Sequence, residues 1–382
     1  MDGIIDADTH LVESEHIWNL IDKKMAHRRP ISVVHQDAAT GQRRTRWVID
    51  GELVPKPDGK GGQALATPPV SPEELEGHDW LTKSLVDVPA RLADADKMGV
   101  DVQVVFPTLF IAHLTDDPEL DVALSWAYNR WLADAHSRGG ERLRWVCILP
   151  FTDIPACIEQ LNWSREHGAV GFMARGIEGE RSLAEPWFFP VYEEASKLNM
   201  PMCIHTGPGS PVISSVLDNR LGGSFPGVRM LPLMAFQHLV GNRIPEQFPD
   251  LKIGFIETGA SWVPYVLHYI ERDWRRKKWL DVPHLGPDLF KDYRLFISCE
   301  SDEDIPYLTS YVGEENLISG SDYGHHFGQL PTIEPISFEN RARGGDISAD
   351  LALVGELRAR EDMQPGTLDK ILKTNPRHFY GM

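Results

Sequence analysis

Short apolar runs alternate with longer helix-like segments along most of the chain. Such runs predict buried β-strands when turn residues bound them. The eight predicted strands span residues 3–7, 102–106, 143–149, 169–173, 202–205, 253–256, 295–298 and 317–319. Helix-like stretches separate most of them, at residues 88–97, 121–136, 154–167, 187–198 and 262–273. This alternation predicts an α/β fold, and right-handed crossovers between eight strands favour a closed (β/α)8 TIM barrel over an open sheet.

Three longer segments interrupt the alternation. Residues 29–80 include RRTRWVIDGELVPKPDG, which predicts a β-hairpin at residues 43–54, followed by a Pro/Gly-rich stretch. Residues 207–233 form a long loop after the fifth strand, and residues 338–362 follow the eighth. Loops of this length in a compact domain are typically functional. We therefore expect a single barrel domain over residues 1–382, with the hairpin inserted after strand one and these segments around the active-site mouth.

Composition and charge narrow the classes of partner. The 382 residues are 42% hydrophobic and 25% charged, as in ordinary folded proteins, and the net charge is −18. Such an acidic body repels nucleic acid and anionic membrane surfaces. No apolar run is long enough to span a bilayer, the first residues lack a secretory pattern, and the four cysteines form no CxxC motif. We expect a cytoplasmic protein that binds a small molecule, and neither nucleic acid nor membrane.

Ionisable residues follow three of the predicted strands at their carboxyl ends, where this fold places its chemistry. Asp8 and His10 end the first strand and project to the same side, because they are two residues apart. His205 ends the fifth strand, and Asp322 follows the eighth within GSDYGHH. A single histidine at a strand end is more often structural, but two aspartates and two histidines at the ends of three strands predict a metal site. The mixed set of oxygen and nitrogen donors suits one divalent ion, with Zn²⁺ favoured and Mn²⁺ or Fe²⁺ as alternatives.

Two further residues are candidate proton carriers. Glu257 follows the sixth predicted strand, and a carboxyl group does acid–base chemistry near neutral pH if burial raises its pKa. His238 lies in the helix-like LMAFQHLVGNRI before that strand and supplies an imidazole instead. Each also has a purely structural interpretation, Glu257 as a hydrogen-bond acceptor and His238 as a packed helix residue. Asp322 is a third candidate, as a base acting on bound water.

Candidate substrate contacts come from the ends of other predicted strands and from the hairpin. They are Arg175 after strand four, Glu300 after strand seven, His325 after strand eight and Trp47 in the hairpin. Arginine suits the recognition of a carboxylate because its guanidinium donates two parallel hydrogen bonds. The competing interpretation for Arg175 is an ion pair with Glu178 or Glu180, which we hold slightly more favourable.

Several motifs in the expected order resemble the second amidohydrolase family, in the branch related to aminocarboxymuconate semialdehyde decarboxylase. They are IIDADTHLVE, RLADADKMGVDVQVVFPT, YNRWLADAHSRGGERLRWVCILP, MPMCIHTG, FPDLKIGFIETGASWVPYVLHYIERD, SGSDYGHH and KTNPRHFYG. The resemblance implies a metal-dependent barrel that hydrolyses C–N, C–O or C–C bonds or decarboxylates acids without redox chemistry. It places the family's metal ligands on Asp8, His10, His205 and Asp322. Two positions depart from the family pattern: Asp8, where the name-giving enzyme has histidine, and Glu257, where many members have histidine.

We expect first a hydrolase that acts on a small aromatic or cyclic carbonyl compound through a metal-activated water. In that reaction Asp322 accepts the proton of the water, and Glu257 or His238 protonates the leaving group. The alternative is a non-oxidative decarboxylase of an aromatic or vinylogous acid, with Arg175 positioning the acid. A barrel that binds without catalysis is a third hypothesis. Family resemblance also implies a homodimer or a higher homo-oligomer. The motifs GxGxxG after a strand, GxxxxGK[ST] and GxSxG are absent.

Overall fold

Eight parallel strands form the central sheet of the computed structural model, which describes residues 3–37, 41–57, 59–218, 225–278, 285–325, 353–364 and 366–382. In sheet order they are β1 (Ile5–His10), β5 (Val102–Phe106), β6 (Leu143–Cys147), β7 (Ala169–Arg175), β10 (Met202–His205), β11 (Ile253–Ile256), β12 (Leu295–Ser298) and β13 (Leu317–Ile318). The sheet curls back on itself, because Thr9 of β1 pairs in parallel with Tyr323 and the His10 amide donates to the Tyr323 carbonyl at 2.6 Å. The predicted (β/α)8 barrel is therefore confirmed.

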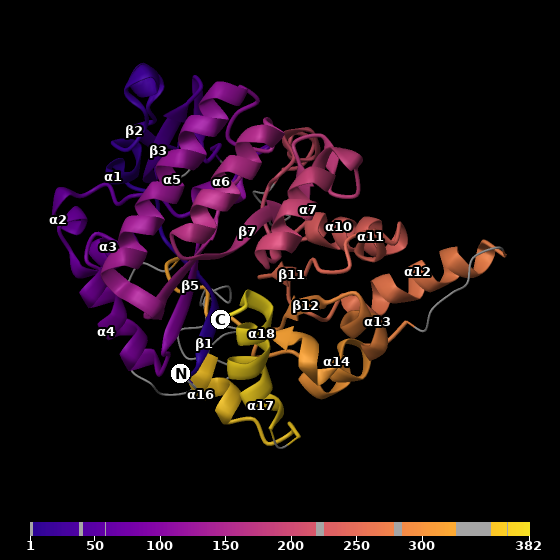
Figure 1. Cartoon of the computed structure of the whole chain (residues 1–382). Coiled ribbons are helices and arrows are strands. Elements are labelled where there is room, and N and C mark those ends of the chain that lie inside the picture. The colour runs from indigo at the N-terminus through magenta and orange to yellow at the C-terminus, as the bar shows by residue number, and fades with distance from the viewer. Residues whose placement is uncertain are drawn as a thin grey trace.

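Helices cover the outside of the barrel between successive strands (Figure 1). The main ones are α4 (Val88–Met98), α5 (Pro118–Gly139), α6 (Ile154–Glu166), α7 (Phe189–Leu198), α10 (Met230–Gly241), α12 (Val263–Arg276), α14 (Ile305–Val312) and α18 (Asn375–Tyr380). Asp87, Asp117 and Asp153 begin three of them, since each side chain accepts a backbone N–H of the first turn and a proline follows within that turn. The final helix, α18, lies beside the start of β1, because the Tyr380 hydroxyl donates to the Ala7 carbonyl at 2.7 Å.

Short helices and strands fill the connections. The short helices are α1 (Glu15–Trp18), α2 (Pro72–Leu75), α3 (His78–Lys83), α8 (Pro211–Ser214), α11 (Ile244–Gln247), α13 (Pro287–Asp292), α16 (Leu353–Arg358) and α17 (Thr367–Asp369). A small hairpin of β8 (Ile177–Glu178) and β9 (Arg181–Ser182) follows β7. Of the predicted mouth segments, residues 219–224 of the first and 338–352 of the second lie outside the described residues.

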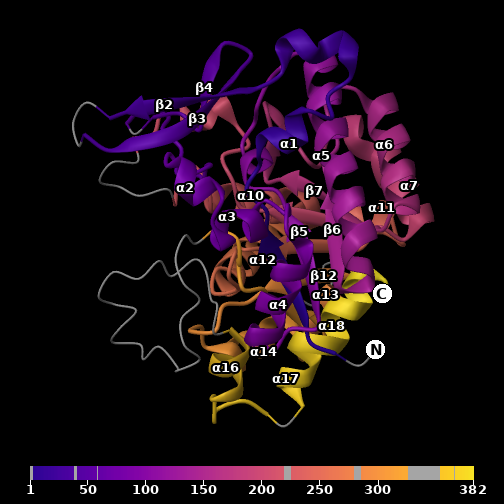
Figure 2. The same cartoon turned by 90° about the vertical axis from the view of Figure 1, so that its left-hand side faces the viewer.

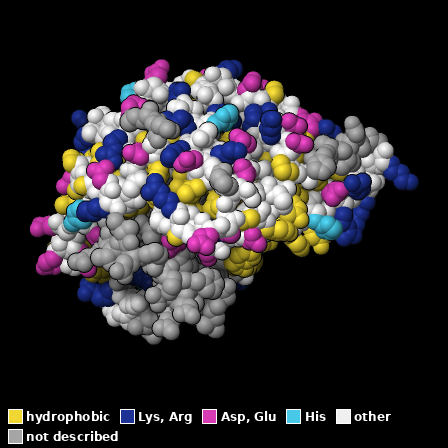
Figure 3. Space-filling model, turned by 90° about the horizontal axis from the view of Figure 1, so that it is seen from below, with side chains coloured by type: hydrophobic (Ala, Val, Ile, Leu, Met, Phe, Trp, Pro, Cys, Tyr) yellow, Lys and Arg dark blue, Asp and Glu magenta, His cyan; other side chains and the backbone are white. Residues whose placement is uncertain are grey.

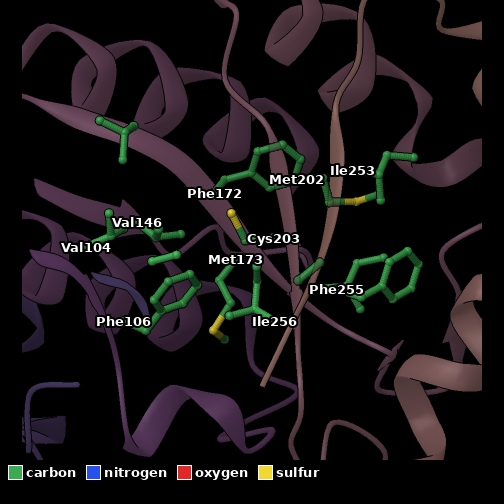
Figure 4. Close-up of a cluster of buried hydrophobic side chains, with 14 of the residues drawn as sticks. Val104, Phe106, Val146, Phe172, Met173, Met202, Cys203, Ile253, Phe255 and Ile256 are labelled. Atoms are coloured by element: carbon green, nitrogen blue, oxygen red, sulfur yellow. The ribbon is translucent and has the colours of Figure 1, made fainter. Parts of the chain in front are cut away.

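The core lies along the barrel strands and between them and the helices. Figure 4 shows apolar side chains from five neighbouring strands packed together, among them Phe106, Phe172, Met202 and Phe255. All four are fully buried. Because neighbouring residues of a strand point to opposite faces, each barrel strand buries one set of side chains inside the barrel and the other against the helices. This packing fixes the strands whose carboxyl ends carry the candidate site.

A second sheet forms the predicted insertion after β1. It consists of β2 (Ile31–Gln36), β3 (Arg43–Ile49) and β4 (Glu52–Val54), all antiparallel, and it projects from the barrel in Figure 2. The predicted hairpin at residues 43–54 is confirmed as β3 and β4, joined through Asp50 and Gly51 at positive φ angles of 52° and 83°. The additional strand, β2, was not predicted, because most of its side chains are exposed and no buried face marks it.

The surface carries charges of both signs. On the face shown in Figure 3, acidic and basic side chains are interspersed, with apolar side chains between them. The net charge of −18 is therefore not concentrated into a continuous acidic layer on this face. Among the described residues, we find no helix that is both long enough and apolar enough to cross a membrane.

Candidate metal centre

The candidate centre lies at the carboxyl ends of the barrel strands. Asp8 and His10 belong to β1, His205 is the last residue of β10, Glu257 directly follows β11, and Asp322 follows β13. In a parallel barrel these strand ends meet at one mouth. The structure therefore brings together all four residues that the sequence predicted as metal ligands, with Glu257 beside them.

The nitrogen and oxygen atoms of these side chains gather at one point of the mouth in two overlapping groups that share His10 and Glu257. Asp8 and His205 complete one group, and Asp322 and His325 complete the other. His10 Nε2 lies 3.2 Å from Asp322 Oδ1 and 3.5 Å from Asp8 Oδ1, and His205 Nε2 lies 3.5 Å from Asp8 Oδ1. Donor atoms about 2.1 Å from a shared ion are separated by roughly 3.0–3.5 Å in octahedral or tetrahedral geometry. The observed separations match this spacing, so the residues fit a divalent ion.

Hydrogen bonds fix both imidazoles with one nitrogen facing this point. His10 Nδ1 lies 2.7 Å from the Pro107 carbonyl and His205 Nδ1 lies 2.8 Å from the Thr206 carbonyl. A carbonyl only accepts, so each Nδ1 carries the proton and each Nε2 presents a lone pair, which is the tautomer that binds a metal. Within the described part of the chain, His10 Nε2, His205 Nε2 and Asp8 Oδ1 are buried without a hydrogen-bond partner, as is Glu257 Oε2. A bound cation would satisfy all four atoms.

The carboxyl group of Glu257 faces the same point as the predicted ligands. Its Oε2 lies 3.5 Å from His205 Nε2 and 3.9 Å from His10 Nε2. Its backbone has a positive φ of 55°, and that of Asp322 has 54°, a conformation that costs energy in residues other than glycine and often marks functional sites. The geometry therefore admits Glu257 either as a further ligand or as a proton carrier beside the ion.

Burial and mutual charge shift the pKa values at the centre. Burial, together with the neighbouring His325 and His205, holds the pKa of His10 well below its ordinary value, so this imidazole is neutral and able to ligate. Burial raises the pKa of Glu257 to about 8, and the nearby charge of Asp322 adds to the effect. Burial lowers the pKa of His205, but Asp8 and Glu257 outweigh it, so the net shift is upward. Two carboxylates around His205 Nε2 thus favour a positive charge at this point.

His325 also lies at the centre. Its ring stacks on the His10 ring with centroids 3.8 Å apart, and its Nδ1 lies 2.8 Å from Asp322 Oδ1. Its other nitrogen lies 3.1 Å from the Thr108 hydroxyl, on the loop after β5. Its predicted contact with substrate stays a prediction, while the neighbouring His326 lies outside the described residues.

The other predicted site residues lie elsewhere or contact other partners. Arg175 donates through Nε to Glu178 at 2.8 Å and through Nη1 to the Ala112 carbonyl at 2.7 Å, so it forms the ion pair that we held more favourable. His238 lies on α10 with Nδ1 2.8 Å from the Ser182 hydroxyl. Trp47 is buried in the insertion against Trp18, with ring centroids 5.7 Å apart. Their predicted roles toward substrate or proton transfer stay predictions.

Sequence reasoning missed Arg229, which connects the centre to Glu300. Its Nη1 donates to the Glu257 carbonyl at 2.6 Å and lies 3.3 Å from Glu300 Oε1, while its Nη2 lies 3.5 Å from Glu257 Oε1. Arg229 ends the sequence RLGGSFPGVR, which marked the loop as functional without singling out this residue. Arg229 thus places a positive charge beside the Glu257 carboxyl group.

Comparison with known protein families gives a match over nearly the whole chain. The family model described as amidohydrolase matches residues 5–382, which is nearly the whole chain. The chain belongs to the amidohydrolase family. This membership confirms the resemblance found in the sequence and is consistent with a metal-dependent barrel enzyme.

Individual relatives of this amidohydrolase-family chain are distant. A 2-amino-3-carboxymuconate-6-semialdehyde decarboxylase of Dictyostelium discoideum is 21% identical over 330 residues, 85% of this chain and 83% of that protein. The fold is similar to an amidohydrolase from Mycobacterium avium subsp. paratuberculosis (TM-score 0.74, 17% identity, 100% and 98% of the two chains). It is also similar to 5-carboxyvanillate decarboxylase from Novosphingobium aromaticivorans, solved with manganese and 4-hydroxy-3-methoxy-5-nitrobenzoic acid (TM-score 0.66, 18% identity, 100% and 96%). At these identities the solved structures establish the shared fold.

Proposed function

We propose that this chain is a metal-dependent, non-oxidative decarboxylase of a small aromatic or vinylogous acid. The observation that carries the proposal is the carboxyl group of Glu257, which faces the same two imidazoles as the predicted ligands and has its pKa raised to about 8 by burial. Decarboxylation needs such an acid, because the ring carbon must take up a proton as carbon dioxide leaves. Two relatives named as decarboxylases lend further support.

His10, His205, Asp322 and Asp8 would hold the ion. When bound, a divalent ion supplies a Lewis acid that chelates a carboxylate and an adjacent hydroxyl or carbonyl oxygen. The donor set fits Zn²⁺ and Mn²⁺ equally well in ligand type, since both accept imidazole and carboxylate. Manganese in the 5-carboxyvanillate decarboxylase structure makes Mn²⁺ as reasonable a candidate here as the Zn²⁺ that the sequence favoured.

The chain's own residues would carry the proton and orient the acid. Burial and the nearby charge of Asp322 raise the pKa of Glu257, which favours its protonated form, and Glu257 would donate that proton to the ring carbon. The bond between that carbon and the carboxylate then breaks, carbon dioxide leaves, and the electron pair restores the ring. Arg229 holds the backbone of Glu257 through its carbonyl and would offer a positive charge to the carboxylate of the substrate, a role that we had predicted for Arg175.

Hydrolysis of a cyclic carbonyl compound, which the sequence favoured, is the second candidate. Asp322 supports it, because Oδ1 lies 2.8 Å from His325 Nδ1 and such a pair suits removal of a proton from water. The named relatives support decarboxylation better. The expected cytoplasmic location and homo-oligomeric state do not distinguish between the two candidate functions.

Product analysis separates the two reactions. Zn²⁺-loaded and Mn²⁺-loaded protein would be incubated with hydroxybenzoic and vanillic acids that carry a carboxylate ortho to the hydroxyl group, and separately with cyclic amides and esters. Each incubation would be run in water enriched in ¹⁸O and in parallel in D2O. We expect carbon dioxide, one deuterium on the ring carbon that lost it, and no ¹⁸O in the organic product. An organic product containing ¹⁸O, formed from cyclic amides or esters without carbon dioxide, would instead establish the hydrolase. The His205→Ala variant controls for metal-independent release.

A further inference from the structure

One buried carboxylate beneath the centre has no place in the proposed chemistry. Asp6 lies on β1, two residues before Asp8, and its side chain is 1% exposed. Its Oδ1 accepts the Ser321 amide at 2.8 Å and its Oδ2 accepts the Ser321 hydroxyl at 2.5 Å. Both oxygens therefore contact the residue that directly precedes Asp322, on the other side of the barrel closure.

Asp322 is held from both sides in its strained conformation. Its amide donates to the Asp8 carbonyl at 3.0 Å, and the next residue, Tyr323, accepts the His10 amide at 2.6 Å. The Tyr323 amide donates in turn to the Ser321 hydroxyl at 3.2 Å, so this hydroxyl joins Asp6 to the residue after Asp322. A positive φ of 54° at Asp322 persists only where the surroundings fix it, and these hydrogen bonds do so.

We propose that Asp6 is a positioning residue that, through Ser321, fixes Asp322 as a metal ligand before any ion binds. The inference rests on the proposed metal centre. An ion binds more tightly to ligands that are already in place, because binding then costs less conformational entropy. Partners of ligands in other metal proteins typically change metal affinity by about 10–100-fold when they are mutated. Asp6 is one step further from the ion than such partners, because it contacts Ser321, the neighbour of the proposed ligand Asp322, and not Asp322 itself.

Metal affinity of the full chain tests the proposal without requiring a substrate. Metal-free protein would be titrated with Zn²⁺ in competition with a chromophoric chelator, for the native chain, Ser321→Ala, Asp6→Asn and the double variant. We expect Ser321→Ala to raise the Kd about 10-fold and Asp6→Asn at least as much. The double variant should match Asp6→Asn alone, because both changes remove the same interaction.

Asp101→Asn is the matched control. Asp101 lies after α4, and its carboxylate accepts the Ile4 amide at 2.8 Å at the opposite end of β1 from the centre. Asp101→Asn replaces a carboxyl group of β1's surroundings by an amide, as Asp6→Asn does, but far from the centre. We therefore expect a Kd for Zn²⁺ within twofold of the native value. Ser321→Ala loses only a hydroxyl and changes no charge, so it serves even if Asp6→Asn does not fold, as circular dichroism would show.

Three outcomes overturn the inference. A native-like Kd for Ser321→Ala shows that the hydrogen bond does not position the ligand. Additive losses in the double variant show that Asp6 acts independently of the Ser321 hydroxyl. An equal loss in Asp101→Asn shows that the effect is general to β1. Native protein that binds no Zn²⁺ at stoichiometric levels would refute the metal centre itself, which is a different result.

Discussion

Individual residues at the centre combine burial, strain and unusual pKa values. Glu257 stands out because the family resemblance in the sequence implies a histidine at this position in many members, yet its carboxyl group faces both imidazoles of the predicted ligands. A carboxyl group can serve the same purpose as an imidazole once burial has raised its pKa toward neutrality. The residue can therefore act as an acid without help from His238, which is bonded to Ser182 on α10.

Replacement of Glu257 by Gln separates its two possible roles. If Glu257 carries the proton, Glu257→Gln lowers kcat by about 10²–10⁴-fold while the metal content stays at its native value. The amide keeps the shape of the side chain but cannot donate a proton as an acid. Steady-state kinetics and metal analysis on the same preparation check this prediction. A variant that loses its metal in parallel with its activity would show that Glu257 is a ligand.

A second buried carboxyl group predicts how stability depends on pH. Burial raises the pKa of Glu13 to about 8, although the amides of Thr108 and Leu109 donate to it at 3.1 and 2.8 Å. Its ordinary carboxyl pKa in the unfolded chain is lower, so the folded state binds the proton more tightly. The contribution to stability is complete below the unfolded pKa and falls as pH rises, by about 1.4 kcal/mol per unit, until pH passes about 8.

Urea unfolding at pH 6 and pH 8 measures this effect. We expect Glu13→Gln to lose less stability than the native chain over that interval, by roughly 2 kcal/mol. Glu159→Gln, on the exposed side of α6, is the control and should follow the native chain. Parallel losses in the native chain and in Glu13→Gln would mean that Glu13 is ionised throughout.

At the scale of elements, four predicted strands match the structure residue for residue. These are β5, β10, β11 and β12, which read as apolar runs because helices cover one side and the barrel interior the other. The apolar run predicted for β1 covers residues 3–7, whereas the strand spans Ile5–His10. Its polar residues Asp6, Asp8 and His10 interrupt the apolar pattern by which the other strands were recognised.

Other parts of the site could not be predicted from sequence for physical reasons. That Asp8, His10, His205 and Asp322 lie close together could be predicted, because the strand ends of a barrel converge whatever the loops do. Arg229 was missed because it reaches the centre from a loop whose path no periodicity encodes. Arg175 ends β7 at the mouth, but its guanidinium is taken up by Glu178, a contact that depends on the turn between β7 and β8.

The contact between β1 and the segment after β13 leaves no room for a side chain at Gly320. A Cβ there would lie 2.6 Å from the Asp8 amide nitrogen and 2.4 Å from its Cβ. Gly320→Ala should therefore displace Asp8 and raise the Kd for the metal at least 10-fold, because changes to the partners of metal ligands typically weaken metal binding by about that much. Competition titration with Zn²⁺ measures the change.

Gly254→Ala provides the comparison for Gly320→Ala. Its Cβ would lie 2.3 Å from the Phe379 ring of α18, away from the mouth. This overpacking should lower the free energy of unfolding by about 1–3 kcal/mol and leave the metal Kd unchanged. Equal metal affinities in the two variants would contradict the arrangement of Asp8 against Gly320.

At the scale of the whole molecule, the last helix packs against the first strand of the barrel. Figure 1 shows the two ends of the chain side by side, and Tyr380 of α18 bonds to β1 as described above. Part of the acidic excess of the chain is located at the candidate metal centre. The carboxyl groups of Asp8, Glu257 and Asp322 lie around His10 Nε2 where β1, β11 and β13 end, and a divalent cation would offset their repulsion.

The metal content of the purified chain, measured beside that of His205→Ala, tests the central claim most directly. His205 is fully buried and its Nε2 faces Asp8 and Glu257, so its replacement by alanine removes one nitrogen donor from the centre. His167→Ala, on a histidine bonded to the Trp163 carbonyl at the end of α6, is the control. We predict about one divalent ion per native chain and per His167→Ala chain, and close to none in His205→Ala. A native chain without stoichiometric metal, or a His205→Ala variant that retains it, would contradict the account.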